Sequence, residues 1–184
     1  MNRLRKHYEN ILQEDLLLKQ NPKNIRGIAK ISKINLNNSS KDYLVDEKLV
    51  IPSLVAVELL GGQVCQNNRS KKSIANFKLT KDNLIGFQVC FRKDKLYSIL
   101  DKLFLLVAPN SKSFKGYSKN QLLDSNGITL SIISPLLFPE FEENYNFFEY
   151  VSSYDLSLIT TSKSKSESIL LLSGFQIPFV KENF

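Results

Sequence analysis

The chain has 184 residues, 42% of them hydrophobic, so it can bury a core without disulfides or metals and is not disordered throughout. Residues 1–120 carry 22 Lys and Arg against 10 Asp and Glu, whereas residues 121–184 carry 3 against 8. A basic half attracts a polyanion, because phosphates release counterions when they are neutralised. The composition therefore favours nucleic acid as the partner, with a generally basic surface as the alternative.

Hydrophobic spacing predicts a mixture of helices and strands in the first half of the chain. In order, these are a helix at 4–19, a strand at 28–37, a helix at 44–60, a short polar strand at 63–68, an exposed loop at 69–83 and a strand at 84–92. Pro52 lies inside the second helical pattern and marks either a kink or a later helix start. Gly61 and Gly62 indicate where that helix ends.

The second half continues the mixture. It contains a helix at 94–108 closed by Pro109, polar turns at 110–126, a strand at 127–133, an acidic and aromatic stretch at 139–150 without a clear period, a strand at 154–161 and a helix from the capping box Ser164–Glu167 to Gly174. This order predicts the α+β class: a mixed, mainly antiparallel sheet with helices packed on one face and the other face free for RNA. We expect a single domain over 1–184, with an N-terminal helix and linker at 1–27 and an α+β body at 28–184.

Few residues suit catalysis or metal binding. Cys65 and Cys90 form no CxxC pair and His7 cannot complete a zinc site with them, so we interpret the cysteines as buried small hydrophobes in a reducing compartment. The closely spaced acids of 140–143 are typical of a solvated surface. No phosphate-binding loop, dinucleotide fingerprint or nucleophile elbow occurs. We therefore expect no enzyme, no catalytic residue, no cofactor and no metal.

Membrane and targeting signals are missing from the sequence pattern. No apolar run approaches the ~20 residues that span a bilayer. Acids such as Glu9 follow the basic start at once, and transit peptides avoid acids, so we expect no cleaved targeting signal. Lys outnumbers Arg 20 to 5, a bias typical of AT-rich coding in many organelle genomes.

The segment from Arg69 to Lys81 has the composition of an RNA-binding loop. Five cations fall within thirteen residues without an acid, interleaved with small hydroxyl and amide side chains. Cations neutralise phosphates, Ser and Asn donate to phosphate or 2′-OH oxygens, and an aromatic ring can stack on a base. The candidate residues are Arg69, Lys71, Lys72, Ser73, Asn76, Phe77, Lys78 and Lys81, and the alternative is a solvated surface loop.

Two further groups of residues have similar chemistry. Residues 110–119 contain three lysines, two aromatics and a glycine without an acid. A third group comes from the predicted strand faces, where amides and cations can lie on an RNA minor groove and contact its 2′-hydroxyls. Its members are Lys30, Lys33, Asn37, Gln63, Gln88 and Arg92.

Several motifs, taken in chain order, resemble one known family. They are His7–Glu9 with Leu16–Lys19, Ile31–Asn37, Gly62-Gln63, Arg69–Lys78, Ile85-Gly86, Val107–Pro109 with Phe114–Gly116, Phe138–Glu140, and Thr160–Ser162 with Leu171–Phe175. Together they extend over nearly the whole chain. The chain resembles large-subunit ribosomal protein number five, the 5S rRNA-binding family, in its bacterial and organellar form. Among these, it most resembles the mitochondrial members.

The resemblance implies a structural role in the large ribosomal subunit. It implies that the strand-face group above holds 5S rRNA at the central protuberance, and that the loop at 69–83 reaches towards P-site tRNA. It also implies an intersubunit contact with a protein of the small-subunit head, beside the acidic region 140–147, through Lys112, Phe114, Lys115 and Gly116. Large-subunit rRNA and neighbouring central-protuberance proteins are further expected partners. The expected compartment is a mitochondrion whose own genome encodes the chain, with a plastid or a bacterial cytoplasm as alternatives.

The chain departs from the family pattern at three places. Cys90 stands where the family usually has Thr, which affects one hydrogen bond between sheet and RNA. Residues 64–68 lack the family's cation density, and the glycine-rich run expected near 120–127 is mostly replaced. The runner-up interpretation is a non-ribosomal RNA-binding or RNA-chaperone module of similar fold.

Overall fold

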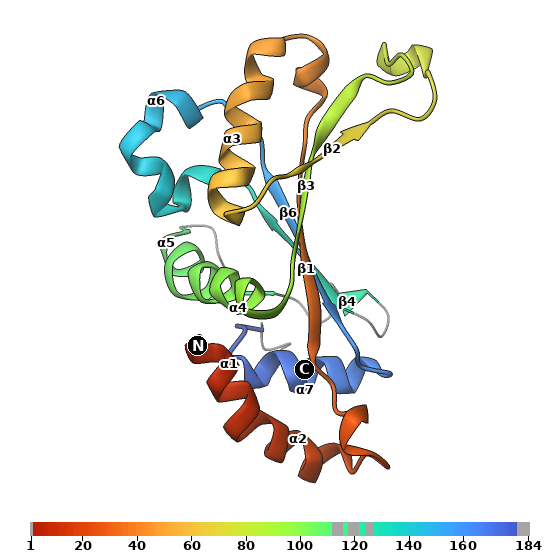
Figure 1. Ribbon diagram of the computed structural model, residues 1–184, viewed down its shortest axis with the longest axis vertical. Coiled ribbons are helices and arrows are strands. Elements are labelled where there is room, and N and C mark those ends of the chain that lie inside the picture. The colour runs from red at the N-terminus through yellow and green to blue at the C-terminus, as the bar shows by residue number, and fades with distance from the viewer. Residues whose placement is uncertain (1, 112–115, 118–121, 124–126, 180–184) are drawn as a thin grey trace. The chain divides into compact units, whose positions relative to one another are not determined.

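The structure is a computed structural model that describes residues 2–111, 116–117, 122–123 and 127–179 (Figure 1). Contacts divide the chain into two compact units. The first unit combines residues 1–34, 92–130 and 157–184, and the second unit combines residues 35–91 and 131–156. The single domain expected over 1–184 stays a prediction.

The N-terminal helix of the first unit is continuous. It comprises α1 (Arg3–His7), the π-helical turn η1 (Tyr8–Leu12) and α2 (Gln13–Gln20), which confirms the helix predicted at 4–19. Asn2 caps the start, because its Oδ1 accepts a hydrogen bond from the Leu4 backbone N–H at 3.0 Å. Asn21 ends the helix in the left-handed conformation at φ 44°, and the short 3₁₀ helix η2 (Ile25–Gly27) follows.

The second long helix of the first unit also has three segments. α4 (Lys93–Lys102) continues through η6 (Leu103–Val107) into α5 (Ala108–Asn110), so the predicted helix at 94–108 is confirmed and ends two residues later than expected. α1 packs against α4 and is joined to it by ion pairs from Arg3 to Asp101 at 3.0 Å and from Arg5 to Asp94 at 2.7 Å. No helix among the described residues is long and apolar enough to cross a membrane.

The last helix, α7 (Lys165–Gly174), closes the core of the first unit. Its predicted capping box is confirmed, since the Ser164 Oγ accepts from the Glu167 N–H at 3.3 Å and the Glu167 Oε2 accepts from the Lys163 N–H at 2.8 Å. Phe175, just beyond the helix, stacks on Tyr8 with ring centroids 5.9 Å apart. Both aromatic side chains are buried, so the N-terminal helix and the segment just after α7 share one core.

One sheet carries all the strands. They are β1 (Ile31–Ser39), β2 (Gln66–Arg69), β3 (Leu84–Phe91), β4 (Leu122–Leu123), β5 (Gly127–Ile132) and β6 (Tyr154–Thr160), in the spatial order β2-β3-β1-β6-β5-β4. β2 pairs with β3 and β4 with β5 in antiparallel register. The expected α+β class with a mainly antiparallel sheet is therefore confirmed, as are the strands predicted within 28–37, 63–68, 84–92, 127–133 and 154–161, with shifted ends.

In the second unit, the helix predicted at 44–60 starts later than its pattern. Two 3₁₀ helices, η3 (Lys41–Leu44) and η4 (Glu47–Leu49), precede α3 (Val50–Gly61). Pro52 therefore lies in the first turn of α3, where a backbone N–H would have no intrahelical partner. Of the two predicted alternatives, the later helix start is confirmed and the kink is wrong. Gly62, at φ 55°, ends the helix as predicted.

α3 lies along β3 and covers one face of it (Figure 1). Phe87, Val89 and Phe91 point into this core, each at most 2% exposed. A side chain at Gly61 would start 3.2 Å from the Phe91 ring, so the glycine lets helix and strand approach closely.

The stretch at 139–150 proves to be η9 (Pro139–Asn144) followed by α6 (Tyr145–Phe148), after the 3₁₀ helix η8 (Pro135–Leu137).

Candidate nucleic-acid interface

The face of β3 that points away from α3 is polar and continues over its neighbours. Gln88 and Gly86 alternate with the buried core residues, and in the antiparallel register Gln66 lies opposite Gln88 and Asn68 opposite Gly86. Opposed residues in antiparallel strands point to the same side. On β1 the half-buried Asn35 and Asn37 alternate with buried residues. We call this surface the amide face, and it consists of Asn35, Asn37, Gln66, Asn68 and Gln88.

The amide face is held in one arrangement by direct contacts. The Asn68 Nδ2 donates to the Asn37 Oδ1 at 3.3 Å, which joins β2 to β1 across β3. Gly86 lies under this contact, and a Cβ at that position would be only 2.2 Å from the Asn38 carbonyl oxygen. Beside the face, the Gln63 Nε2 donates to the Cys90 carbonyl oxygen at 3.0 Å. The backbones of β1 and β3 therefore approach so closely that only glycine fits at position 86.

Amide side chains carry both donors and acceptors without charge. Such groups match 2′-hydroxyls and base edges in the shallow minor groove of RNA, where shape and hydrogen bonding dominate recognition. The cysteines do not fit their predicted burial: Cys65 and Cys90 are both free of disulfides and only half-buried. Cys90 follows Gln88 on the same side of β3, so a thiol stands at the edge of the amide face.

The six predicted strand-face residues are divided between the two units. Asn37, Gln63 and Gln88 belong to the second unit. The three cations, Lys30, Lys33 and Arg92, belong to the first unit. Lys30 and Arg92 are exposed and flank strands rather than lying in them. The sequence interpretation missed Asn35, Gln66 and Asn68, although the polar alternation along each strand is the signal that finds them.

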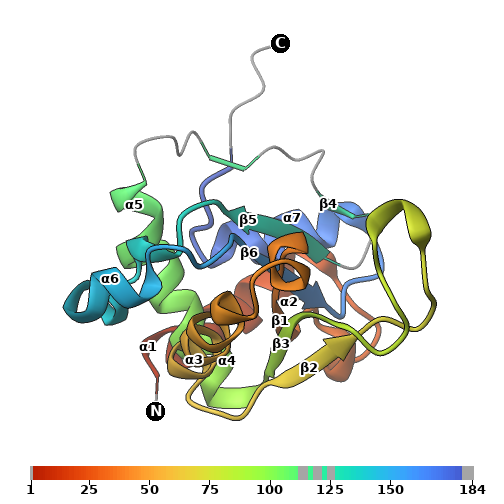
Figure 2. The same ribbon diagram turned by 90° about the horizontal axis from the view of Figure 1, so that it is seen from above.

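The predicted loop at 69–83 is an ordered hairpin rather than a loop without structure. At its base the Ser70 N–H donates to the Asn83 carbonyl at 2.9 Å, and the Asp82 N–H donates to the Ser70 carbonyl at 3.0 Å. Ser70 is buried, and its hydroxyl donates to the Thr80 carbonyl. Figure 2 shows β2 and β3 side by side with this segment joining them. We call residues 70–83 the basic hairpin.

The tip of the basic hairpin is closed by its own backbone. Ile74 and Leu79 exchange two hydrogen bonds, at 2.9 and 3.1 Å, around the 3₁₀ turn η5 (Ala75–Phe77). Lys78 adopts the left-handed conformation at φ 53° to complete the turn. Phe77 is 72% exposed at this tip. The backbone therefore holds an aromatic side chain out towards solvent.

The cations of the loop face solvent. Arg69, Lys71, Lys72, Lys78 and Lys81 are all exposed. Within the described part of the chain, the ion pairs join other basic residues to acids and involve none of these five. Their charge is thus open to a polyanion, and the exposed Ser73 and Asn76 lie between them as further donors.

The structure describes only one residue of the predicted intersubunit site. Of the expected intersubunit residues, Lys112, Phe114 and Lys115 lie outside the described residues, and Gly116 has φ 95°. Next to it, the Tyr117 N–H donates to the Pro178 carbonyl at 2.9 Å. The contact of this segment with a small-subunit protein stays a prediction.

His7 and the acidic residues, the groups considered for catalysis in the sequence, take part in structural contacts or face solvent. The His7 Nε2 lies 3.3 Å from the Gly174 carbonyl oxygen and so ties the N-terminal helix to the end of α7. Among the described residues, no three His, Cys, Asp or Glu side chains gather as metal ligands do. Of the closely spaced acids at 140–143, Glu142 and Glu143 are exposed, in keeping with solvated acids, whereas Glu140 is half-buried.

Comparison with known proteins agrees with these features. The model of the C-terminus of the ribosomal L5 family matches residues 84–179. The large ribosomal subunit protein uL5m of Reclinomonas americana is 39% identical, over 98% of this chain and 100% of that protein. The uL5m protein of Prototheca wickerhamii is 32% identical, over 95% of this chain and 82% of that protein.

An α+β fold with these relatives defines a structural protein of the large ribosomal subunit. More narrowly, the chain belongs to the ribosomal L5 family, in its mitochondrial form. Its partners are therefore rRNA and other ribosomal proteins, and it is not an enzyme. The family resemblance expected from the sequence is confirmed, and the runner-up, a non-ribosomal RNA-binding module, is set aside.

Proposed function

We propose that the protein binds 5S rRNA at the central protuberance through the amide face. Gln63 and, from the first unit, Lys30, Lys33 and Arg92 are the further residues proposed for this contact. The observation that carries the proposal is the Asn68–Asn37 hydrogen bond, because it joins amides from β1 and β2 into one ordered surface. An ordered surface of neutral donors and acceptors suits the 2′-hydroxyls of an RNA minor groove.

The basic hairpin is proposed to reach towards P-site tRNA. Support comes from its exposed cations, which are suited to phosphates, and from its shape: it extends beyond the ends of β2 and β3 within its unit (Figure 1). A hairpin closed at base and tip by backbone bonds loses less entropy when it binds than a flexible loop would. A contact of Lys112, Phe114, Lys115 and Gly116 with a small-subunit head protein is proposed on the family resemblance alone, as are neighbouring central-protuberance proteins.

A filter-binding measurement with a 5S rRNA transcript tests the proposed role of the amide face. The double variant Asn37→Ala, Asn68→Ala removes the central pair, and we expect binding to weaken roughly tenfold as two hydrogen-bonding side chains are lost. The matched control is Asn144→Ala, Asn146→Ala, which removes two exposed amides from the acidic part of the same unit. Equal affinities of the two double variants, with both folded by circular dichroism, would remove the amide face from the RNA contact.

The hairpin proposal has its own test. Lys71→Ala, Lys72→Ala should leave 5S rRNA binding and subunit assembly intact and lower the affinity of assembled ribosomes for P-site tRNA. Failure of the large subunit to assemble with this variant would instead assign these lysines to rRNA. The exposed pair Lys163→Ala, Lys165→Ala, in the first unit, serves as a control for loss of positive charge.

A further inference from the structure

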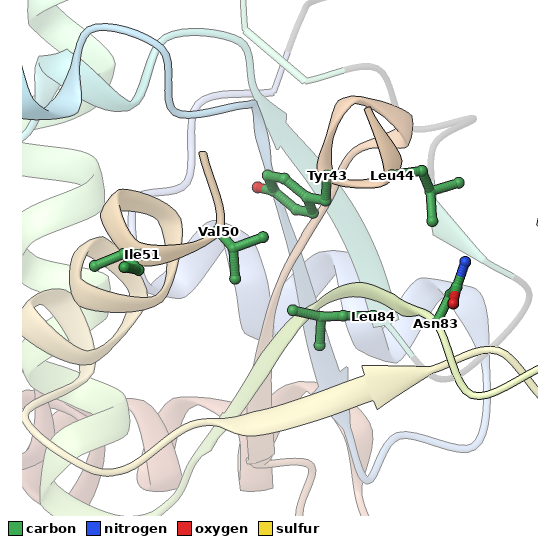
Figure 3. Close-up of a pocket in the computed structure, with 6 residues that line it drawn as sticks. All are labelled: Tyr43, Leu44, Val50, Ile51, Asn83 and Leu84. Atoms are coloured by element: carbon green, nitrogen blue, oxygen red, sulfur yellow. The ribbon is translucent and has the colours of Figure 1, made fainter. Parts of the chain in front are cut away.

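A groove opens between the tip of the basic hairpin and the segment that follows β1. Its volume is about 700 Å³, and all its lining residues belong to the second unit. One wall carries Lys41, Asp42 and Val45, on and just after η3, and the other carries Phe77 and Lys78 from the hairpin tip. A smaller cavity of about 370 Å³ adjoins it through the shared Leu44, and Figure 3 shows its side chains between η3, α3 and the start of β3.

Both walls of the groove present apolar side chains to solvent. Val45 is 81% exposed and Phe77 is 72% exposed, and the half-buried Leu44 and Leu79 also line the groove. Large apolar side chains exposed on two facing walls are characteristic of binding surfaces rather than of ordinary solvated loops. The groove therefore has the form of a site for a flat, partly apolar group.

The two walls are held in place by contacts of different kinds. Behind η3, the Tyr43 hydroxyl donates to the buried Asn38 Oδ1, and the Tyr43 ring lies 6.1 Å from the Phe87 ring. The opposite wall is held by the Ile74–Leu79 hydrogen bonds at the hairpin tip. Since both walls are ordered before any ligand arrives, binding would cost little rearrangement.

The lysines that line the groove favour an occupant that carries negative charge. Lys41 and Lys78 come from opposite walls, so an anion can be met on either side of a group that lies between them. Asp42 is the one acid among the groove's described lining residues, and its carboxylate already accepts from the Ser40 hydroxyl at 2.8 Å. Further cations on the basic hairpin raise the positive potential on the Phe77 side.

We propose that this groove, named the nucleotide groove, receives one unpaired nucleotide of the RNA that lies on the amide face. The base stacks on Phe77 against Val45, and the phosphates on either side of it meet Lys41 and Lys78. This inference rests on the proposed function, which makes that RNA 5S rRNA; within the basic hairpin it gives Phe77 and Lys78 to 5S rRNA and leaves Lys71 and Lys72 to P-site tRNA. Stacking on an exposed aromatic ring is sequence-tolerant and strong enough to fix one nucleotide.

Continuity with the amide face favours 5S rRNA over other occupants. The groove begins at Ser39, the last residue of β1, and at Ile85, near the start of β3, and both strands carry the amide face. An RNA strand on that face therefore passes the mouth of the groove. An apolar protein segment would satisfy Val45 and Phe77 but would leave the two lysines without a charge partner, so a nucleotide fits better.

The absence of tryptophan from the chain allows a direct test. In Phe77→Trp the only indole stands in the nucleotide groove, and a stacked base should quench its fluorescence when a 5S rRNA transcript is added. Phe147→Trp is the matched control, because Phe147 is an aromatic residue of the same unit, 45% exposed, in the acidic segment. Quenching at position 77 and none at position 147 is the expected result.

A second pair of variants probes the opposite wall. Val45→Asp places an acid beside the expected phosphates and should weaken 5S rRNA binding about tenfold, while Ile133→Asp, in the same unit and outside the groove lining, should leave it unchanged. Val45 and Ile133 are similarly exposed, at 81% and 79%, so neither change should unfold the protein and both add one negative charge. Equal effects of the two variants would overturn the groove as the nucleotide site.

The outcomes separate failure of this inference from failure of the proposed function. If the wild-type protein does not bind the transcript, the proposed function itself fails. If the transcript binds but the indole of the Phe77→Trp variant keeps its fluorescence, the nucleotide groove alone is overturned. If tRNA quenches that indole and 5S rRNA does not, the assigned RNA is wrong. If Val45→Asp spares RNA binding but excludes another ribosomal protein from the subunit, the occupant is a protein segment and the inference is again overturned.

Discussion

Asn68 on β2 and Asn37 on β1 touch over the strand that separates them, with the Asn68 Nδ2 donating to the Asn37 Oδ1 at 3.3 Å. Strands two positions apart in a sheet are separated by roughly 10 Å, which two asparagines span only if nothing stands between them. Gly86 is directly opposite Asn68 and has no side chain to block the contact. The glycine thus permits both a close approach of β1 and β3 and a continuous amide face.

Gly86 is therefore expected to be intolerant of substitution. In Gly86→Ala the new Cβ would lie 2.2 Å from the Asn38 backbone oxygen, which cannot swing away as a side chain could. We expect unfolding free energy to fall by about 3 kcal/mol, measured by urea denaturation. Gly27→Ala is the control, because a Cβ at Gly27 would meet nothing within 4 Å. A Gly86→Ala midpoint equal to that of Gly27→Ala would show that β1 and β3 can separate at little cost.

The buried polar contact behind η3 should stabilise the second unit. Tyr43→Phe removes the hydroxyl that donates to the fully buried Asn38. The same hydroxyl lies 2.9 Å from the Ser152 Oγ. Loss of a buried hydrogen-bond partner costs about 1–2 kcal/mol, which urea denaturation can resolve. Tyr150→Phe, at a tyrosine 68% exposed, should change stability little. Identical midpoints for the two variants would argue that water replaces the missing hydroxyl.

The exposed lysines of the basic hairpin should appear in the salt dependence of RNA binding. If Lys71 and Lys72 each neutralise one phosphate, the double alanine variant should lower the slope of log affinity against log salt by about 1.5. The measurement is tRNA binding to assembled ribosomes at several salt concentrations. An unchanged slope would mean that the two lysines meet no phosphate, whatever the change in affinity at one salt concentration.

Alkaline pH should weaken the first unit through Tyr97. Burial is the main cause that raises the pKa of Tyr97 from 10.0 to about 12. Because the folded pKa lies above the unfolded one, the stabilisation is complete below pH 10 and is lost as pH rises towards 12. Urea midpoints measured across this window should fall less steeply for Tyr97→Phe than for the wild type. A parallel decline of the two would assign the alkaline loss to other groups, such as Tyr117, whose pKa burial also raises to about 12.

Local patterns in the sequence were sufficient for most elements of the fold. The alternation of Phe87, Val89 and Phe91 and the capping box at Ser164 depend on residues close in the chain, so both predictions are confirmed. The start of α3 could not be predicted in the same way. The helical pattern was read from residue 44, but the chain forms 3₁₀ turns at Lys41–Leu44 and Glu47–Leu49 instead. There the Tyr43 hydroxyl donates to the buried Asn38, a contact that local spacing does not reveal.

The sequence by itself determined that the chain is basic at one end, that its loop at 69–83 is rich in cations and that its motifs follow the ribosomal L5 pattern. Only the tertiary structure decided which amides form one surface. Asn37 and Asn68 are 31 residues apart, and their contact depends on strand order, register and an empty position at Gly86. The nucleotide groove likewise joins η3 to the hairpin tip. Neither depends on local spacing, because side chains from distant segments meet only after the strands have paired.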